Sequence, residues 1–354
     1  MIVHAPWLLL VVIALAVGFW LGRRSVGLPS EPAPAQPARE SAPPAKASPG
    51  GDRRAAPSLP TSRAGGGRPA LGAARSWGYQ LQDIDVGRAA ASRADVLVLD
   101  YARDGTDDTA LTPGDIERLK RKPDGSRRLL LAYCSIGEAE SYRFYWQKQW
   151  KRQKPGWLLG ENPDWEENYS VRFWDPGWQR IIFGGTASYV DRIVAQGFDG
   201  VYLDKCDVFE DIREHFGKVA RERADLEEDM VDFVAGVATH VRGLRSDFLV
   251  VMQNAEPLLE FPALRRVIDG VAKEELLFGL DRPEKANARD DVDWSRERLD
   301  LVKADGKPVF VVEYLDTPAR ILDAQRRIAD LGYILYVAPK DRELDRLREN
   351  IAEA

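Results

Sequence analysis

The feature that most limits how this chain can fold is a series of eight short runs of apolar and aromatic residues after residue 75. The runs occupy residues 77–81, 96–99, 129–133, 201–203, 249–252, 271–272, 309–312 and 333–337. Short apolar runs bounded by turn-forming residues are typical of parallel strands that are buried on both faces. The sequence therefore predicts a sheet covered by other structure on each side.

Amphipathic stretches lie between several of these runs, for example at 187–196, 226–242 and 320–331. Alternating strands and helices build a parallel sheet, and eight units in about 265 residues match the size of one (β/α)8 TIM barrel. A doubly wound open sheet is the competing α/β fold. Because no Gly-x-Gly-x-x-Gly follows the first run, the dinucleotide-binding form of that competitor is disfavoured.

The first 75 residues differ from the rest in composition. Residues 5–22 carry no charged side chain, are just long enough to cross the hydrocarbon core of a bilayer, and have Trp7 and Trp20 near their ends. Residues 25–75 are rich in Pro, Ala, Gly and Ser, a composition that cannot bury a core. We therefore predict a transmembrane anchor helix within residues 1–24, a disordered linker over 25–75 and the barrel domain over 76–354.

Composition also excludes several functional classes. The net charge is −6, with acids and bases interspersed, so a nucleic-acid partner is not expected. Two cysteines and three scattered histidines argue against a disulfide scaffold and a zinc site, so we expect no metal and no other cofactor. The sequence has no Gly-x-Ser-x-Gly elbow and no phosphate-binding loop, and Cys134 lacks a histidine at a strand end.

Carboxylates follow many of the apolar runs, namely Asp100, Glu138, Asp204, Asp207, Glu274 and Glu313. In a barrel the C-terminal ends of the strands form one rim, where the chemistry takes place. Carboxylates crowded in a cleft push their pKa values apart, which is the division of roles that glycoside cleavage needs. Hydrolysis assisted by Mg²⁺ or Ca²⁺ is an alternative use of these acids, and Asp204 could instead cap the next helix.

The connection after the third run is long and aromatic. It contains nine tyrosines and tryptophans, namely Tyr142, Tyr145, Trp146, Trp150, Trp157, Trp165, Tyr169, Trp174 and Trp178. These rings could form the core of a subsidiary layer, or a platform that packs against sugar rings. A connection of this length is usually functional, and both interpretations stay open.

Seven strings, met in order along the chain, resemble glycoside hydrolase family 114. They are Tyr79-Gln80-Leu81-Gln82, Ser135-Ile136-Gly137-Glu138-Ala139-Glu140, Tyr145-Trp146, Trp174-Asp175-Pro176, residues 197–204, Gln253-Asn254 and residues 268–274. That family contains endo-α-1,4-polygalactosaminidases. The resemblance implies a (β/α)8 barrel that cleaves α-1,4-linked galactosamine-containing polysaccharide.

The resemblance also implies which residues are catalytic. The family's catalytic Asp at the end of the fourth strand falls on Asp204, and its catalytic Glu at the end of the sixth strand falls on Glu274, although Glu275 adjoins it. Strands of the same parity point into the same layer of a barrel, so Asp204 can act as nucleophile and Glu274 as general acid/base of a retaining mechanism. We expect the substrate-binding residues to be Tyr79, Asp100, Tyr133, Glu138, Tyr145, Trp146, Asp207, Gln253, Asn254, Glu313 and Tyr314.

Two other functions fit the same residues less well. One is a non-catalytic, membrane-tethered barrel that binds polysaccharide during exopolysaccharide assembly. The other is a scaffold domain in an envelope complex, with the aromatic connection as its protein interface. Both proposed catalytic acids are present in the sequence, which favours the enzyme.

Two observations point to opposite sides of the membrane for the barrel domain. Arg23 and Arg24 follow the apolar stretch, which favours a cytoplasmic domain. The polymers that the resembling family cleaves are secreted or lie in the cell envelope, which favours the opposite side. We expect an anchored, extracytoplasmic domain with a polysaccharide substrate and with envelope polysaccharide-assembly proteins as candidate partners.

Overall fold

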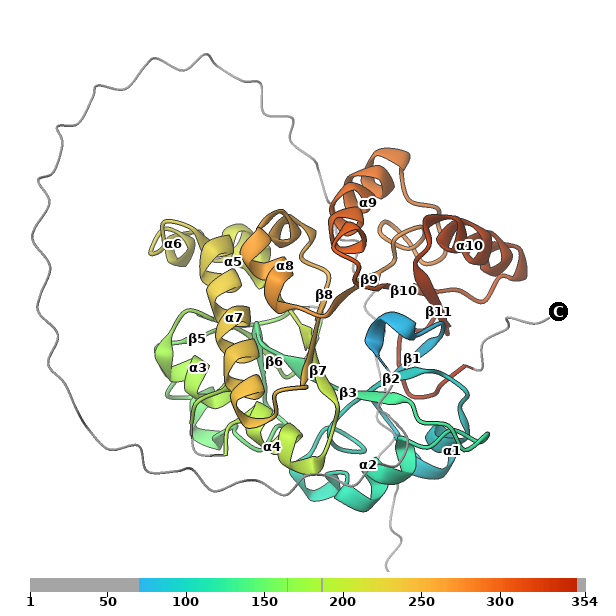
Figure 1. Cartoon of the computed structure of the whole chain (residues 1–354). Helices are drawn as coiled ribbons and strands as arrows, with labels where there is room; N and C mark the ends of the chain where they lie inside the picture. Colours follow the sequence, from blue (N-terminus) through green and yellow to red (C-terminus); the bar gives the residue numbers. More distant parts are fainter. Residues whose placement is uncertain (1–69, 164, 186, 349–354) are drawn as a thin grey trace, which may run out of the picture. The chain divides into compact units, whose positions relative to one another are not determined.

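Eight parallel strands form the sheet around which the domain is built (Figure 1). The computed structural model describes residues 70–163, 165–185 and 187–348. In their order across the sheet the strands are β1 (Trp77–Gln80), β2 (Val96–Leu99), β3 (Leu129–Ser135), β7 (Gly200–Asp204), β8 (Leu249–Gln253), β9 (Gly270–Glu274), β10 (Val309–Tyr314) and β11 (Ile334–Ala338). Each strand pairs in parallel with the next. The predicted (β/α)8 architecture is confirmed.

The first and last strands of this sheet are brought together by side chains. The indole Nε1 of Trp77 donates a hydrogen bond of 3.0 Å to the carbonyl oxygen of Ile334. Aromatic rings fill the interior: the ring centroids of Trp77 and Tyr336 are 5.8 Å apart, and those of Tyr79 and Tyr202 are 5.3 Å apart. The interior is therefore a packed core, as expected for a barrel of eight strands.

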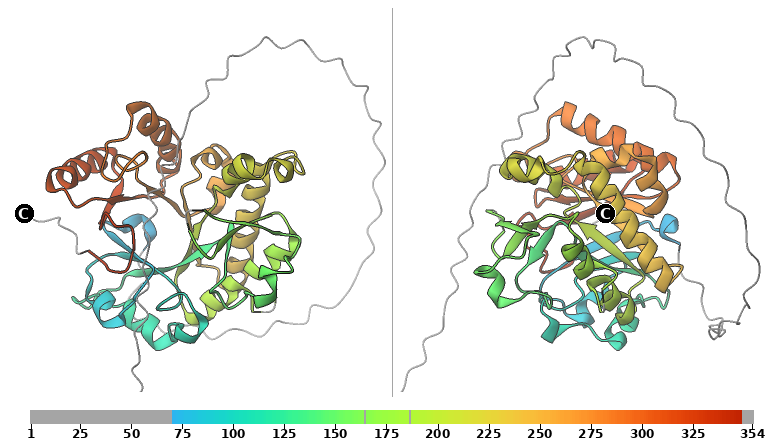
Figure 2. Two further views of the ribbon diagram at one scale, coloured as in Figure 1. Left: turned by 180° about the vertical axis from the view of Figure 1, so that it is seen from behind. Right: turned by 90° about the vertical axis from the view of Figure 1, so that its left-hand side faces the viewer.

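Helices connect the strands and lie around the outside of the sheet (Figure 2). They are α1 (Val86–Ala91), α2 (Pro113–Leu119), α3 (Pro176–Ile182), α4 (Tyr189–Gln196), α5 (Val208–His215), α6 (Gly217–Ala220), α7 (Leu226–Leu244), α8 (Pro262–Val267), α9 (Arg289–Ala304) and α10 (Pro318–Leu331). The three amphipathic stretches of the sequence correspond to α4, α7 and α10. Proline begins four of these helices, at a position where its missing N–H has no partner to lose.

A small antiparallel sheet is inserted after β3. It contains β4 (Glu138–Glu140), β6 (Asn168–Val171) and β5 (Leu158–Glu161), in that order. Four short 3₁₀ helices complete the part of the chain that the structure describes: η1 (Leu71–Ala73), η2 (Asp107–Thr109), η3 (Lys148–Lys151) and η4 (Glu256–Glu260). The long aromatic connection predicted from the sequence thus has secondary structure of its own.

Most aromatic residues of this insertion pack on one another. The ring centroids of Trp146 and Tyr169 are 4.9 Å apart and nearly stacked, and Trp157 lies 5.1 Å from Trp178. Trp157, Trp178 and Tyr169 are buried, whereas the side chain of Trp165 is 56% exposed. The interpretation as the core of a subsidiary layer therefore holds for most of these rings.

The N-terminal boundary of the packed domain lies earlier than the sequence indicated. Leu71 and Ala74, which were expected in the linker, are buried against the aromatic interior of the barrel. The predicted anchor helix and most of the linker, residues 1–69, lie outside the described residues. Within residues 70–348, leaving out 164 and 186, no helix is long and apolar enough to cross a membrane.

Candidate active site

Alternation along the strands decides which polar residues face the inside of the barrel. Tyr79, Tyr133, Tyr202 and Tyr314 pack in one interior cluster, while their strand neighbours pack toward the helices. Asp204 lies two residues after Tyr202, and Glu274 lies two residues after Ala272 of the same interior cluster. Both carboxylates therefore face inward from the C-terminal ends of β7 and β9.

Glu274 is held by three side chains from neighbouring strands. One carboxylate oxygen, Oε2, accepts hydrogen bonds from Gln253 Nε2 and, over 3.3 Å, from Asn254 Nδ2. The other, Oε1, accepts a hydrogen bond from the hydroxyl of Tyr314. The backbone N–H of Glu274 donates in return to Asn254 Oδ1 over 3.1 Å, and Tyr79 donates to Gln253 Oε1 over 3.3 Å. These predicted site residues are brought together as one network.

Asp204 accepts a hydrogen bond of 2.7 Å from the hydroxyl of Tyr133. Burial and then the charge of Glu274 raise the pKa of Asp204 to about 7, against the opposing effect of the Tyr133 hydrogen bond. Asp204 and Glu274 are both half-buried, so each reaches solvent at the rim. The raised pKa means that part of the Asp204 population keeps its proton near neutral pH.

The tyrosines around this pair stay protonated. Burial is the main cause that raises the pKa of Tyr79, Tyr133, Tyr202 and Tyr314 well above the usual value, and the charges of Asp204 and Glu274 add to it for Tyr79 and Tyr202. Their hydroxyl groups are therefore available as neutral hydrogen-bond donors beneath the carboxylates.

Three neighbouring strands are each followed by a residue in the left-handed backbone conformation. Lys205, Asn254 and Glu275 directly follow β7, β8 and β9, and their φ angles are +57°, +52° and +54°. Residues other than glycine rarely adopt this left-handed conformation, which concentrates at functional sites. The turn directs Glu275 away from Glu274, and Glu275 forms an ion pair with Arg342. The geometry thus favours Glu274 over Glu275 as the catalytic acid.

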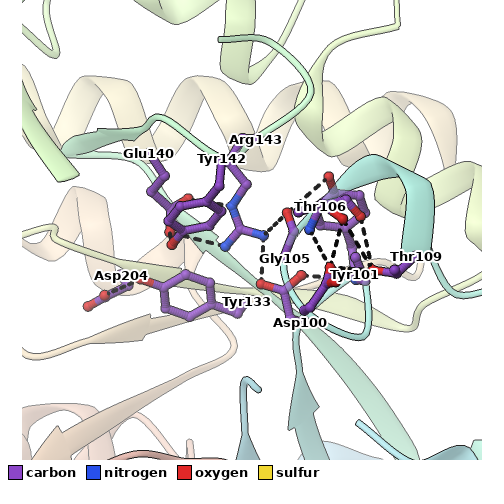
Figure 3. Close-up of polar contacts among 12 residues, drawn as sticks. Asp100, Tyr101, Gly105, Thr106, Thr109, Tyr133, Glu140, Tyr142, Arg143 and Asp204 are labelled. Carbon is purple, nitrogen blue, oxygen red and sulfur yellow. Dashed lines mark hydrogen bonds and ion pairs between the residues drawn. The ribbon is translucent and has the colours of Figure 1, made fainter. Parts of the chain in front are cut away.

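A buried ion network lies beside Tyr133 (Figure 3). Arg143 binds Asp100 with 2.7 Å between Nη1 and Oδ2, and Glu140 with 2.7 Å between Nε and Oε2. Tyr142 donates to Glu140 Oε1 over 2.6 Å. The guanidinium carbon lies 5.9 Å from the centre of the Tyr133 ring, whose hydroxyl points to Asp204. The Arg143 network therefore packs against Tyr133, whose hydroxyl donates a hydrogen bond to Asp204.

Several predicted substrate-binding residues have structural partners instead. Glu313 is fully buried, and its carboxylate accepts hydrogen bonds from the backbone N–H groups of Leu277, over 2.7 Å, and of Phe278. It lies next to Tyr314 on β10 and so points to the opposite face, toward the helices. The expectation that Glu313 contacts substrate is corrected: it holds the loop after β9.

Asp100 and Glu138 are likewise buried and paired with cations, and their role in contacting substrate stays a prediction. Asp100 is bound to Arg143, and burial raises its pKa to about 6. Glu138 lies 3.3 Å from the ammonium group of Lys205 and accepts a hydrogen bond of 2.8 Å from Asn162.

Tyr145 and Trp146 lie in the aromatic layer of the insertion. The hydroxyl of Tyr145 accepts a hydrogen bond from the backbone N–H of Glu140, and Trp146 stacks on Tyr169. Both side chains are half-buried, and both pack against the main hydrophobic core.

The sequence interpretation did not include three basic residues that lie near Asp204 and Glu274. Lys273 faces outward between Ala272 and Glu274 and binds Glu256 over 3.1 Å, and Ser295 donates to the same Glu256 oxygen over 2.7 Å. Lys205 and Arg143 were also missed. Asp207, at the start of α5, is half-buried, and burial raises its pKa to about 6. Among the residues that the structure describes, no group of three or more His, Cys, Asp or Glu side chains could hold a metal ion.

The barrel with two coupled carboxylates at the C-terminal ends of alternate strands defines the class of protein: it is a glycoside hydrolase. The chain belongs to glycoside-hydrolase family GH114, whose family model matches residues 57–353. This match confirms the resemblance on which the sequence interpretation depends.

The chain is also similar in sequence to other proteins and in fold to a solved structure. The chain is 37% identical over 283 residues to an uncharacterized protein of Methanocaldococcus jannaschii, a match that covers 77% of each chain. It is 34% identical over 284 residues to an uncharacterized protein of Thermotoga maritima, covering 77% of this chain and 83% of the relative. The glycoside hydrolase domain of PelA from Pseudomonas aeruginosa shares the fold, with a TM-score of 0.54 at 22% identity over 77% of this chain and 97% of that domain.

Proposed function

We propose that this protein is an endo-α-1,4-polygalactosaminidase in which Asp204 is the nucleophile and Glu274 the general acid/base. The observation that carries the proposal is the pair itself. Asp204 and Glu274 end strands of the same parity and face the same interior, and the charge of Glu274 adds to the effect of burial in raising the pKa of Asp204. The substrate is the one that family membership implies.

The proposed reaction has two steps. In the first, a carboxylate oxygen of Asp204 attacks the anomeric carbon while the protonated Glu274 gives its proton to the leaving glycosidic oxygen. In the second, Glu274 takes a proton from water, and the oxygen of that water displaces Asp204 from the anomeric carbon. Both oxygens of Glu274 accept hydrogen bonds, one from Gln253 of β8 and Asn254 of the turn after it, the other from Tyr314 of β10. These bonds orient the carboxyl group for proton transfer.

The charges around the pair suit a cationic sugar. Asp207 and Glu210 lie one helical turn apart at the start of α5, and burial raises the pKa of Glu210 to about 7. The charge of Asp207 contributes to the raised pKa of both Asp204 and Glu210. A protonated amino group of a deacetylated galactosamine unit would relieve this repulsion between neighbouring carboxylates.

Product analysis tests the proposed substrate. The purified protein is incubated with deacetylated α-1,4-linked polygalactosamine, with its N-acetylated form and with a neutral α-1,4-glucan as the control. We expect oligosaccharides of mixed length from the deacetylated polymer, with retained anomeric configuration by NMR, and an intact glucan. Monosaccharide as the sole early product would refute endo action. Cleavage of neither galactosamine polymer would refute the substrate.

The pH dependence of kcat/KM tests the role of Asp204. A nucleophile must be ionised, so kcat/KM should rise as pH increases through about 7, where Asp204 loses its proton. In Tyr133→Phe the hydrogen bond that lowers this pKa is lost, and the rising limb should move upward by about one to two pH units, because a hydrogen bond to a charged group contributes about 1.5–3 kcal/mol. Tyr336→Phe, which changes an interior tyrosine whose hydroxyl accepts from the backbone of Arg348, is the control. A shift of the falling limb instead would make Asp204 the acid.

A further inference from the structure

The backbone that carries Asp204 is joined directly to the segment that leads from β3 into the inserted sheet. The N–H of Ile136 donates a hydrogen bond of 3.0 Å to the carbonyl oxygen of Asp204. A Cβ atom on Gly137 would lie 2.1 Å from the carbonyl oxygen of Lys205, so only glycine permits this approach. The position of the Asp204 carboxylate therefore depends on how firmly the turn at Lys205 is held.

The side chain of Lys205 bridges two elements across this turn. Its ammonium nitrogen lies 3.3 Å from Glu138 Oε1 on β4 and 3.0 Å from Asp211 Oδ2 on α5. The Glu138 side chain is only 4% exposed, and its Oε1 also accepts a hydrogen bond from Asn162. An ion pair with a partner this deeply buried is screened little by solvent and has a defined geometry.

The backbone of Lys205 is strained, and the two ion pairs of its side chain help to keep it in this conformation. With φ at +57°, Lys205 adopts a conformation that costs free energy for a residue with a side chain, and such a conformation persists only where surrounding contacts enforce it. The Gly137 contact and the two ion pairs are such contacts. Releasing the ammonium group would let the turn relax, and Asp204 would move with it.

We propose that Lys205 is a positioning residue for Asp204: its ammonium group fixes the turn after β7 between Glu138 of the inserted sheet and Asp211 of α5. This role rests on the proposed function of Asp204. The inserted sheet then helps to position Asp204, because Glu138 of β4 is the buried ion-pair partner of Lys205. The sheet thus acts on the reacting group through Lys205 and contacts no reacting atom.

The charge of Lys205 has a second effect on Asp204. The groups that bear on Asp204 are Glu274 from β9, Tyr133 from β3, and Asp207 and Lys205 from its own turn, and Lys205 lowers the pKa of Asp204. Around Lys205 itself lie Glu138, Asp207, Asp211 and Asp204. Removing the ammonium group should therefore move the ionisation of Asp204 to higher pH, in addition to releasing the turn.

The test compares Lys205→Met, which keeps the aliphatic stem, with Lys205→Arg, which keeps the charge. The matched control is Lys285→Met, which removes an ammonium group paired with the exposed Asp281. For Lys205→Met we expect kcat to fall by about 10- to 100-fold, as misplacement of a reacting group does, with KM little changed and the rising pH limb moved upward. Lys205→Arg should recover most of kcat, and Lys285→Met should match the wild type.

A purely structural role for Lys205 gives a different result. Lys205→Met would then lose thermal stability while its folded fraction kept the kcat and the pH profile of the wild type, and that result would overturn the proposal. The titration of Asp204, followed by ¹³C NMR of labelled carboxyl groups in wild type and Lys205→Met, needs no substrate. An unchanged titration would overturn the electrostatic effect even if no glycan were cleaved, whereas inactivity of the wild type alone would count against the proposed function.

Discussion

Replacing Asp204 with Asn or Glu274 with Gln is expected to lower kcat for glycan hydrolysis by about 10³-fold or more. The Asn variant has no carboxylate to attack the anomeric carbon, and the Gln variant cannot deliver a proton to the leaving oxygen, a step that contributes about 10²–10⁴-fold by itself. Both substitutions keep the shape of the side chain, so Tyr133 and Tyr314 keep a hydrogen-bond partner. Initial rates measured on the deacetylated polymer check the result.

The matched control for this pair is Glu275→Gln. Glu275 is the next residue in the chain, but its carboxylate is paired with Arg342, so the variant should keep kcat within about tenfold of the wild type. Azide separates the two roles. A variant that lacks the nucleophile should yield a glycosyl azide of inverted configuration, and a variant that lacks the acid/base should yield one of retained configuration. Activity in Glu274→Gln together with inactivity in Glu275→Gln would move the acid by one residue.

Replacing Arg143 with Met should lower the free energy of unfolding by about 3–5 kcal/mol. The side chain of Arg143 is 2% exposed, and those of Asp100 and Glu140 are each 3% exposed, so the substitution leaves two carboxylates in the interior without their cation. Breaking one side of a buried ion pair carries a cost of this size because the remaining charge is not solvated. Urea unfolding at pH 7, followed by tryptophan fluorescence, measures the change.

Two further variants show whether the loss comes from the stranded charges. Arg289→Met removes a guanidinium that is 91% exposed and pairs with Asp293 on the same helix, so the free energy of unfolding should change by less than about 1 kcal/mol. Adding Asp100→Asn and Glu140→Gln to Arg143→Met should recover part of the lost stability. An Arg143→Met protein as stable as Arg289→Met would contradict the assignment of this network.

The strands of the barrel could be predicted because each is buried on both faces and so forms a continuous apolar run. The same alternation would have sorted the polar residues at the strand ends, had it been applied to them. Glu313 has the parity of Val311, which packs toward the helices, whereas Tyr314 has the parity of Val312 in the interior. The small inserted sheet could not be predicted in this way, because its strands are three or four residues long and show no clear alternation.

The ion-pair partners of the residues around the site could not be predicted from the sequence, for a different reason. Arg143 and Asp100 are far apart in the chain, as are Lys205 and Glu138, and neither pair has a characteristic spacing. Which acids stay free and which are neutralised depends on these contacts between distant segments. Motif resemblance singled out Asp204 and Glu274 as the proposed catalytic pair, and the three-dimensional contacts distinguish them from Asp100 and Glu138, which are paired with cations.

The left-handed turns after β7, β8 and β9 restrict how this rim can diverge in evolution. At Lys205, Asn254 and Glu275 any substitute must first tolerate a positive φ angle. Valine, isoleucine and threonine are therefore excluded by sterics, whatever their chemistry, while glycine, asparagine and aspartate are accepted readily. New substrate preferences in relatives with this backbone are more accessible through α5 and the loops beyond the turns than through the three residues that lie beside the carboxylates.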